Sequence, residues 1–280
     1  MSTISFRASE PAAFSALEQA DPLKDLPGTW VGDGFNLIFL PDFQHGNTFR
    51  VKLNKTKENL FIGEVGAPIP DRGSSQNDIE YLGLYYTQEI NDAFDNSSLH
   101  FETGLWLSLP ATSSPPVPVP TIVRQASIPH GDSVLAQGLA VQNIGAPPIP
   151  VIISTPLLGG VPIDDPLFLA PLLTAVPPAG IPASAIIDPN VLLTAAIDGK
   201  SILKNTALAI STISPGSGIL NIPFVTTNAN ATSLNAIFWI EYVQGSDGRI
   251  TLQLQYTQTV ILHFSGIDWP HISVATLIKR

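Results

Sequence analysis

Apolar and polar residues alternate along most of this 280-residue chain, which is the pattern of β-strands with one buried face. The clearest alternation lies at 249–256, whose apolar residues share one face: Ile250, Leu252, Leu254 and Tyr256. Comparable segments, separated by turn residues, lie at 37–40, 48–53, 60–65, 79–90, 99–109, 121–127, 133–141, 206–212, 218–224, 236–243, 259–264 and 271–279. This hairpin-after-hairpin spacing predicts an all-β fold, an antiparallel up-and-down β-barrel of about ten strands.

Three segments break the pattern. Residues 1–27 read as a leader with a short helix at most, around 12–19, and 110–120 is a proline-rich run that predicts an extended loop. Residues 142–215 form a Pro-rich, apolar insertion with few charges, in which Asp165-Pro166 and Asp188-Pro189 each begin a short predicted helix. An insertion this apolar must pack on the barrel as a lid or flank, so 28–280 is predicted to be a single domain.

Composition narrows the function classes. Hydrophobic residues make up 44% of the chain and charged residues 13%, and the net charge of −10 argues against nucleic acid or anionic membranes as partners. The absence of cysteine excludes disulfides and thiolate chemistry. No apolar run is long enough for a membrane span, and the N-terminus does not resemble a secretory signal, so a cytoplasmic location is expected.

The C-terminal stretch 263–280 carries the strongest site candidate, His271, at the start of the last predicted strand. Alternation places Ser273, Ala275 and Leu277 on the same face as His271, and the small residues leave room against an imidazole. Three interpretations are open: a strand-entry histidine in a polar contact, a haem ligand, or a residue that contacts another ligand.

A second candidate pair is His100 and Glu102, which share a strand face at i, i+2. They could supply two ligands of a metal site with His263 or His271 as a third, but the pattern favours a solvated outer face. Glu102 could instead bond to a neighbouring strand or to a tryptophan at the barrel floor. No nucleophile elbow or phosphate-binding loop is present in the sequence, so no hydrolase or nucleotide-binding signature remains.

Three motifs then resemble one family. GTWVGDG (28–34), HFETGLW (100–106) and WPHISVATLIKR (269–280) are similar, in this order, to signature stretches of nitrobindin-like haem-binding barrels, relatives of the fatty-acid-binding proteins and lipocalins. The segment VRQASIPHGDSVLAQG (123–138) is a weaker match. The resemblance covers 28–141 and 236–280, and the Pro-rich insertion has no counterpart in compact members.

The resemblance implies a haem b with His271 as proximal ligand to the iron, and Thr29 near the base of the cavity. It also implies handling of peroxynitrite or nitric oxide at ferric haem, so an enzymatic activity is left open. Further candidates for the ligand pocket are Trp30, Trp106, Tyr256 and His263. The alternative function is a carrier of a fatty-acid-like or other apolar small molecule in the barrel cavity, with the insertion as lid. A barrel plugged by its own side chains is the third possibility.

Overall fold

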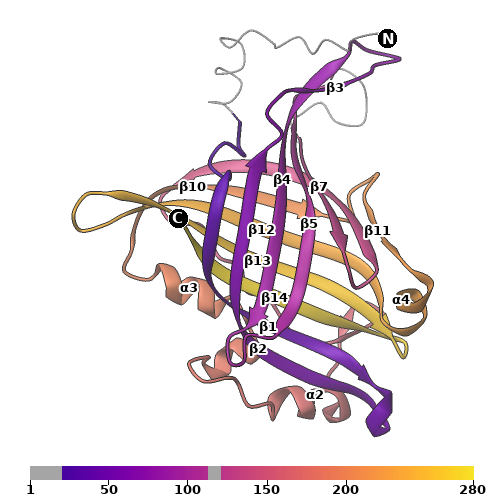
Figure 1. Cartoon of the computed structure of the whole chain (residues 1–280). Helices are drawn as coiled ribbons and strands as arrows, with labels where there is room; N and C mark the ends of the chain where they lie inside the picture. Colours follow the sequence, from indigo (N-terminus) through magenta and orange to yellow (C-terminus); the bar gives the residue numbers. More distant parts are fainter. Residues whose placement is uncertain (1–20, 113–120) are drawn as a thin grey trace.

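The computed structural model describes residues 21–112 and 121–280, and its centre is a closed antiparallel barrel of ten strands (Figure 1). In the order in which they pair, these strands are β1 (Gly28–Asp42), β2 (Asn47–Glu64), β4 (Ile79–Asp92), β5 (Ser98–Leu109), β6 (Thr121–Ile128), β7 (Asp132–Ile144), β10 (Ser201–Ser211), β12 (Asn230–Gln244), β13 (Ile250–Phe264) and β14 (Ile267–Lys279). β14 pairs with β1 and closes the barrel, so the predicted fold class is confirmed. The helix predicted around 12–19 and most of the 110–120 loop lie outside the described residues.

Short strands extend the barrel wall. β3 (Ile69–Asp71) pairs with β4, and the hairpin of β8 (Leu157–Leu158) and β9 (Val161–Pro162) attaches to β14 through one pair, Asp268 with Leu157. β11 (Gly218–Asn221) pairs with the first half of β7, whose second half pairs with β10. β11 therefore continues the wall where β10 stops.

Several strands are longer than the alternation predicts. The segments 48–53 and 60–65 belong to one strand, β2, because the charged stretch between them alternates too: Lys55 and Lys57 face outward while Thr56 and Glu58 are buried in the interior. β13 likewise unites 249–256 and 259–264. The segment 218–224 is shorter than predicted, since α4 (Pro223–Asn228) begins directly after β11.

The segment between β7 and β10 holds the helices α2 (Pro166–Leu173) and α3 (Val191–Ile197), and the 3-10 turn η2 (Ala183–Ile186); another 3-10 turn, η1 (Phe43–His45), lies between β1 and β2. The helix α2 begins after Asp165, as predicted, and the Asp165 side chain caps it: Oδ1 accepts a hydrogen bond from Leu167 N at 2.8 Å. Asn190, not Asp188, directly precedes α3, and its side chain makes no cap bond; the Asp188 carboxylate, two residues earlier, accepts from Ile152 N and Asn190 N. Among the described residues, no helix has the length and apolar character needed to cross a bilayer.

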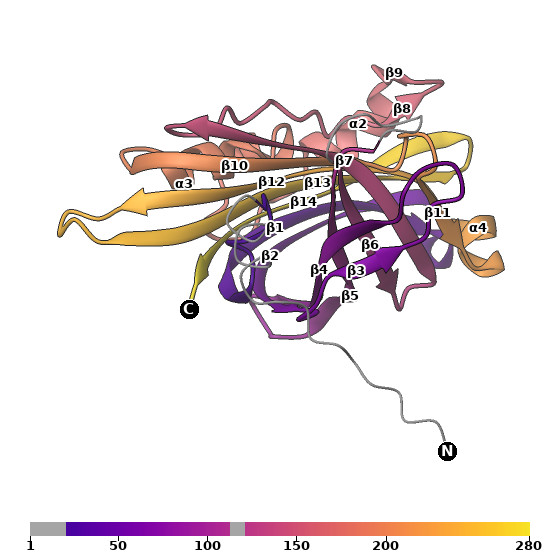
Figure 2. The ribbon, with the colours of Figure 1, turned by 90° about the horizontal axis from the view of Figure 1, so that it is seen from above.

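This segment packs on the outside of the barrel wall, against β1, β12, β13 and β14, as the view from above shows (Figure 2). Apolar residues of the wall and of the segment form a second core: Phe35, Leu37, Phe39, Leu172, Ala185, Ile186, Leu193, Trp239, Phe264, Ile267, Trp269, Ile272 and Val274. Consequently these four strands are buried on both faces. Gln253 and Gln255, predicted to face outward, do so but are fully buried beneath the helices.

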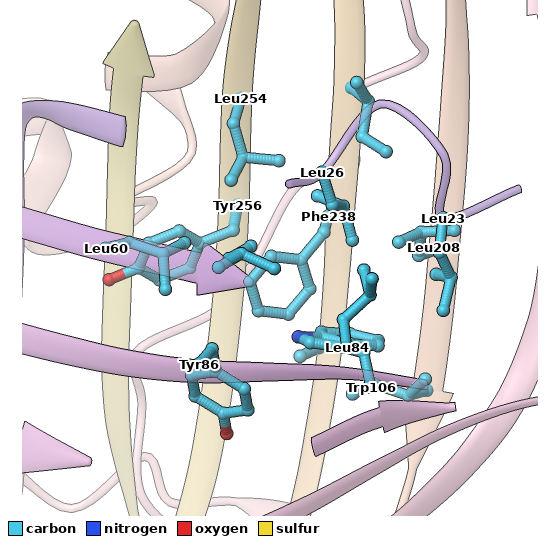
Figure 3. Close-up of a cluster of buried hydrophobic side chains, with 14 of the residues drawn as sticks. Leu23, Leu26, Leu60, Leu84, Tyr86, Trp106, Leu208, Phe238, Leu254 and Tyr256 are labelled. Atoms are coloured by element: carbon cyan, nitrogen blue, oxygen red, sulfur yellow. The ribbon is translucent and has the colours of Figure 1, made fainter. Parts of the chain in front are cut away.

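One half of the barrel interior is filled by apolar side chains (Figure 3). Leu23 and Leu26 close this end from the segment before β1, and the Trp30 indole nitrogen donates to Leu26 O at 2.7 Å. Trp106 packs edge-on against Phe238, which in turn stacks on Tyr256. This apolar half leaves the opposite half of the interior for polar chemistry.

Candidate functional site

The other half of the interior is lined by polar side chains, and we call it the polar half. Its members come from seven strands: Asn36, Thr56, Glu58, Gln88, His100, Glu102, Arg124, Gln258, His271 and Ser273. The expectation that His100 and Glu102 lie on a solvated outer face is wrong. Their face of β5 is the one that carries the buried Trp106, and Glu102 is 2% exposed. An inward carboxylate is tolerated here because a cation on the neighbouring strand pairs with it.

Glu102 and Arg124 form a buried ion pair across β5 and β6. Tyr86 donates its hydroxyl to the same carboxylate, and Arg124 bonds further to Tyr86 OH at 3.0 Å and Gln258 Oε1 at 2.6 Å. Burial by itself would raise the pKa of Glu102, but the charge of Arg124, aided by His100 and Tyr86, outweighs it and lowers the pKa to about 2. Glu102 therefore bonds to neighbouring strands, as one of the sequence hypotheses states, and it is ionised.

A second buried carboxyl, Glu58, has no cation among its hydrogen-bond partners within the described residues. It accepts from Tyr256 OH at 2.7 Å, Thr56 Oγ1 at 2.9 Å and Gln88 Nε2 at 3.1 Å. Burial raises the pKa of Glu58 despite these bonds. Gly34 makes room for it, because a Cβ there would lie 2.6 Å from Glu58 Oε1. The last glycine of the GTWVGDG motif thus makes room for the interior network.

His271 lies on the inward face of β14, bonded to the first strand. Its Nε2 is 2.6 Å from Asn36 Oδ1, and Ser273 Oγ donates to the same oxygen at 3.1 Å. Since an amide oxygen only accepts, Nε2 carries the proton in this arrangement. Burial, with smaller effects from His100 and His130, lowers the pKa of His271 to about 3, so the ring is neutral at physiological pH. The residue nevertheless keeps some accessible surface.

The structure brings together only part of the predicted site. Tyr256 reaches the polar half through its hydroxyl, whereas Trp30 and Trp106 belong to the apolar half. Thr29 precedes Trp30 and so lies on the opposite face of β1. His263 is exposed and bonds to Asp268 Oδ1 at 2.7 Å. Whether any of these residues contacts a ligand stays a prediction.

Sequence reasoning missed Asn36, Glu58 and Arg124 as interior residues. Arg124 left a signal, a lone cation inside the apolar strand TIVRQASI, which indicates a buried partner. The sequence around Glu58 carries no such signal, because the nearby lysines Lys55 and Lys57 are typical of a solvent-exposed strand. In the described part of the chain, no three His, Asp or Glu residues converge as metal ligands, so His100 and Glu102 gain no third.

Several pockets open on the surface of the described residues, and three of them could hold a small molecule. One of about 450 Å³ lies at the tip of the β6–β7 hairpin beside β11, one of about 530 Å³ lies between α3 and the β1–β14 seam, and one of about 160 Å³ lies beside Leu23 and Lys24. His271 lines none of these three.

Comparison with known proteins gives a fold likeness only. No protein-family model matches the chain, and no curated protein matches it. Among solved structures, the crystal structure of Rv2717c from M. tuberculosis is similar over 95% of this chain and 97% of that one, with 16% identity and a TM-score of 0.47. The barrel itself is compatible with ligand binding.

Proposed function

We propose that the barrel binds a small ligand at its polar half through His271, and that the ligand is haem. The observation that carries the proposal is the state of His271: a neutral imidazole on an inward barrel face that keeps accessible surface in an otherwise buried setting. Neutral imidazole is the protein group that ligates haem iron most commonly. The resemblance of the 269–280 segment to the haem-binding barrels points to the same residue.

The residues fit haem in their chemistry, with one condition. Ligation through Nε2 requires His271 to give up its bond to Asn36 and to move its proton to Nδ1. Ser273 can keep Asn36 occupied when this bond is released, since it already donates to the same oxygen. A ferric haem held there would supply the centre for peroxynitrite isomerisation or nitric oxide binding that the resemblance implies.

The test is an absorption titration of the purified protein with haemin. Wild-type protein is expected to develop a Soret band that saturates at one haem per chain, and His271→Ala is expected to lose it or bind at least about tenfold more weakly, a loss of 1.4 kcal/mol or more. His263→Ala is the matched control, because His263 is exposed on the neighbouring strand β13. Equal Soret bands for wild type and His271→Ala, or none for folded wild type, would overturn the proposal.

A carrier of an apolar molecule is the second candidate, and we propose that its ligand lies outside the barrel rather than in the cavity. The apolar half of the interior is filled by its own side chains. The 530 Å³ pocket next to α3, in contrast, is lined by Ile181, Leu192, Leu193 and Val274. Solvent extraction of the purified protein should recover a bound apolar molecule, and Ala196→Trp, which fills this pocket, should reduce its amount.

A further inference from the structure

The pocket of about 450 Å³ at the tip of the β6–β7 hairpin lies on the outer face of the barrel wall. Four of the residues that line it are direct neighbours in the strand register across β5, β6, β7 and β11: Thr103, Ser127, Ser133 and Leu220. Val134, which follows Ser133 on β7, belongs to the interior core, so this row points outward. The inserted segment packs on other strands, β1, β12, β13 and β14.

The hollow follows from the sizes of these outward side chains. Ser127 and Ser133 are small and lie side by side in the middle of the row, and larger side chains line the pocket around them. Phe101 on β5 supplies one apolar side and is 39% exposed, while Leu220 and Ile222 supply the other, with Leu220 78% exposed. A volume of about 450 Å³ is in the range of small-molecule sites.

The floor of the hollow carries hydroxyl groups with unused hydrogen-bonding capacity. Ser127 and Ser133 are exposed, and their hydroxyls have no hydrogen-bond partner among the described residues, although the two residues are direct register neighbours. Thr103 Oγ1 donates to Tyr86 O at 3.1 Å, which leaves its lone pairs available to accept. A hydroxyl both donates and accepts, so this floor is matched by ligand groups that do the same.

No charged group of the described residues that line the pocket reaches the hollow. Asp132 is the acid in this lining, but the register places its side chain on the inward face of β7, and its Oδ1 is buried there. Neither lysine nor arginine is among the lining residues. An anionic ligand would therefore lack a cation, and a cationic ligand would lack an accessible carboxylate. The chemistry of the hollow favours an uncharged ligand.

We propose that this pocket binds a neutral carbohydrate, one sugar ring of which lies with its C–H face on Phe101 and its hydroxyls on Ser127 and Ser133. A pyranose ring combines an apolar face with hydroxyls that donate and accept, which matches an aromatic side beside a hydroxyl floor. Covering Phe101 and Leu220 removes exposed apolar surface from water. A purely apolar molecule would instead leave the floor hydroxyls without a partner. The site is separate from the interior around His271 and goes beyond the proposed function.

The test is a titration of the protein with three neutral methyl glycosides, those of glucose, galactose and N-acetylglucosamine, followed by amide chemical shifts. At least one of them is expected to bind the wild type with millimolar affinity and to shift amides at 101–103, 127–133 and 220–222. Methyl glucuronide, a charged probe, should bind more weakly than the best of the three. Phe101→Ala and the double variant Ser127→Ala/Ser133→Ala should each weaken binding at least about fivefold.

Two matched variants serve as controls and should bind as the wild type does. Phe94→Ala removes an aromatic ring that is 97% exposed at the turn between β4 and β5, and Thr87→Ala removes a hydroxyl that lies opposite Thr103 but outside the pocket lining. The replaced side chains at 101, 127 and 133 are exposed, so these variants should fold.

A folded wild type that binds none of the three neutral glycosides at millimolar concentration would overturn the proposal. Wild-type affinity in Phe101→Ala and in the double serine variant, or tighter binding of the glucuronide, would overturn it too. His271→Ala should bind the glycoside as the wild type does, and a loss of binding there would contradict a separate site. The haem proposal and this one can therefore fail independently.

Discussion

At the scale of residues, the buried carboxyl groups of this protein differ in the partners that offset the cost of burying them. Glu102 has a cation and is ionised, with its pKa lowered to about 2, while Glu58 has only neutral donors and its pKa is raised by burial. Both side chains point into the polar half of the barrel interior and are almost fully buried. The identity of the partner, rather than depth, therefore sets the charge of each.

Arg124→Met should be strongly destabilising, because it leaves Glu102 ionised and buried without its cation. A loss of about 3–5 kcal/mol in the free energy of unfolding is expected at pH 7. Urea denaturation measures it, and the double variant Arg124→Met/Glu102→Gln should recover part of the loss. Arg249→Met is the control, since that side chain is 87% exposed in its ion pair with Asp247. A loss for Arg124→Met no larger than the control's would contradict the assignment.

At the scale of elements, α2 and α3 are short helices whose positions depend on tertiary contacts. Helices of this length are marginal by themselves, so packing against the barrel wall must hold them. α2 presents Leu172 to the second core at 0% exposure, while the adjacent Leu173 is 59% exposed. Neighbouring leucines in one helix thus have opposite environments.

This pair gives a matched test of the second core. Leu172→Ala should lower the free energy of unfolding by about 2–5 kcal/mol, from lost burial and the cavity left behind. Leu173→Ala, with the same change in chemistry and helix propensity, should alter it by about 0.5 kcal/mol or less. Thermal and urea denaturation compare the two. Similar losses for both variants would mean that α2 does not pack on the wall through Leu172.

At the scale of the whole molecule, the barrel wall between its two cores contains a buried acid, Glu241, on the outer face of β12. Gln253 donates to Glu241 Oε2 at 2.5 Å, Lys200 bonds to Gln253, and Glu241 Oε1 has no donor among the described residues. Burial raises the pKa of Glu241 from its ordinary value of 4.5 to about 7, with Gln253 and Lys200 partly opposing the shift. We therefore expect the stability of this part of the barrel wall to depend on pH.

The sign follows from proton binding. Between about pH 4.5 and pH 7, folded Glu241 holds a proton that the unfolded chain has lost, so this residue makes the protein less stable as the pH rises. The contribution is on the order of 3 kcal/mol at most. Glu241→Gln should remove it, so the variant gains stability relative to wild type at pH 8 more than at pH 4.5. Denaturation curves at both pH values check this, and an equal difference at both would contradict it.

Much of the barrel could be predicted from the sequence, because alternation is a local consequence of a strand with two unlike faces. The face of β14 that carries His271 and Ser273 and the inward set of β13 were readable in this way, while the Asp-Pro pair at 165–166 marked the start of α2. The alternation could not say which face of β5 is inside. Leucines suggested one face, yet His100 and Glu102 point inward, since only the fold brings Arg124 alongside Glu102.

The sequence by itself thus determined the strands, their turns, the closed all-β class and the candidate histidine. Tertiary structure decided where the inserted segment lies, which buried acids find a cation, and that His271 faces Asn36 from the other end of the chain, 235 residues away. The physical reason is the range of each effect. Side-chain periodicity is set by the local backbone, whereas burial, ion pairing and pKa depend on residues that meet only when β14 pairs with β1 and the barrel closes.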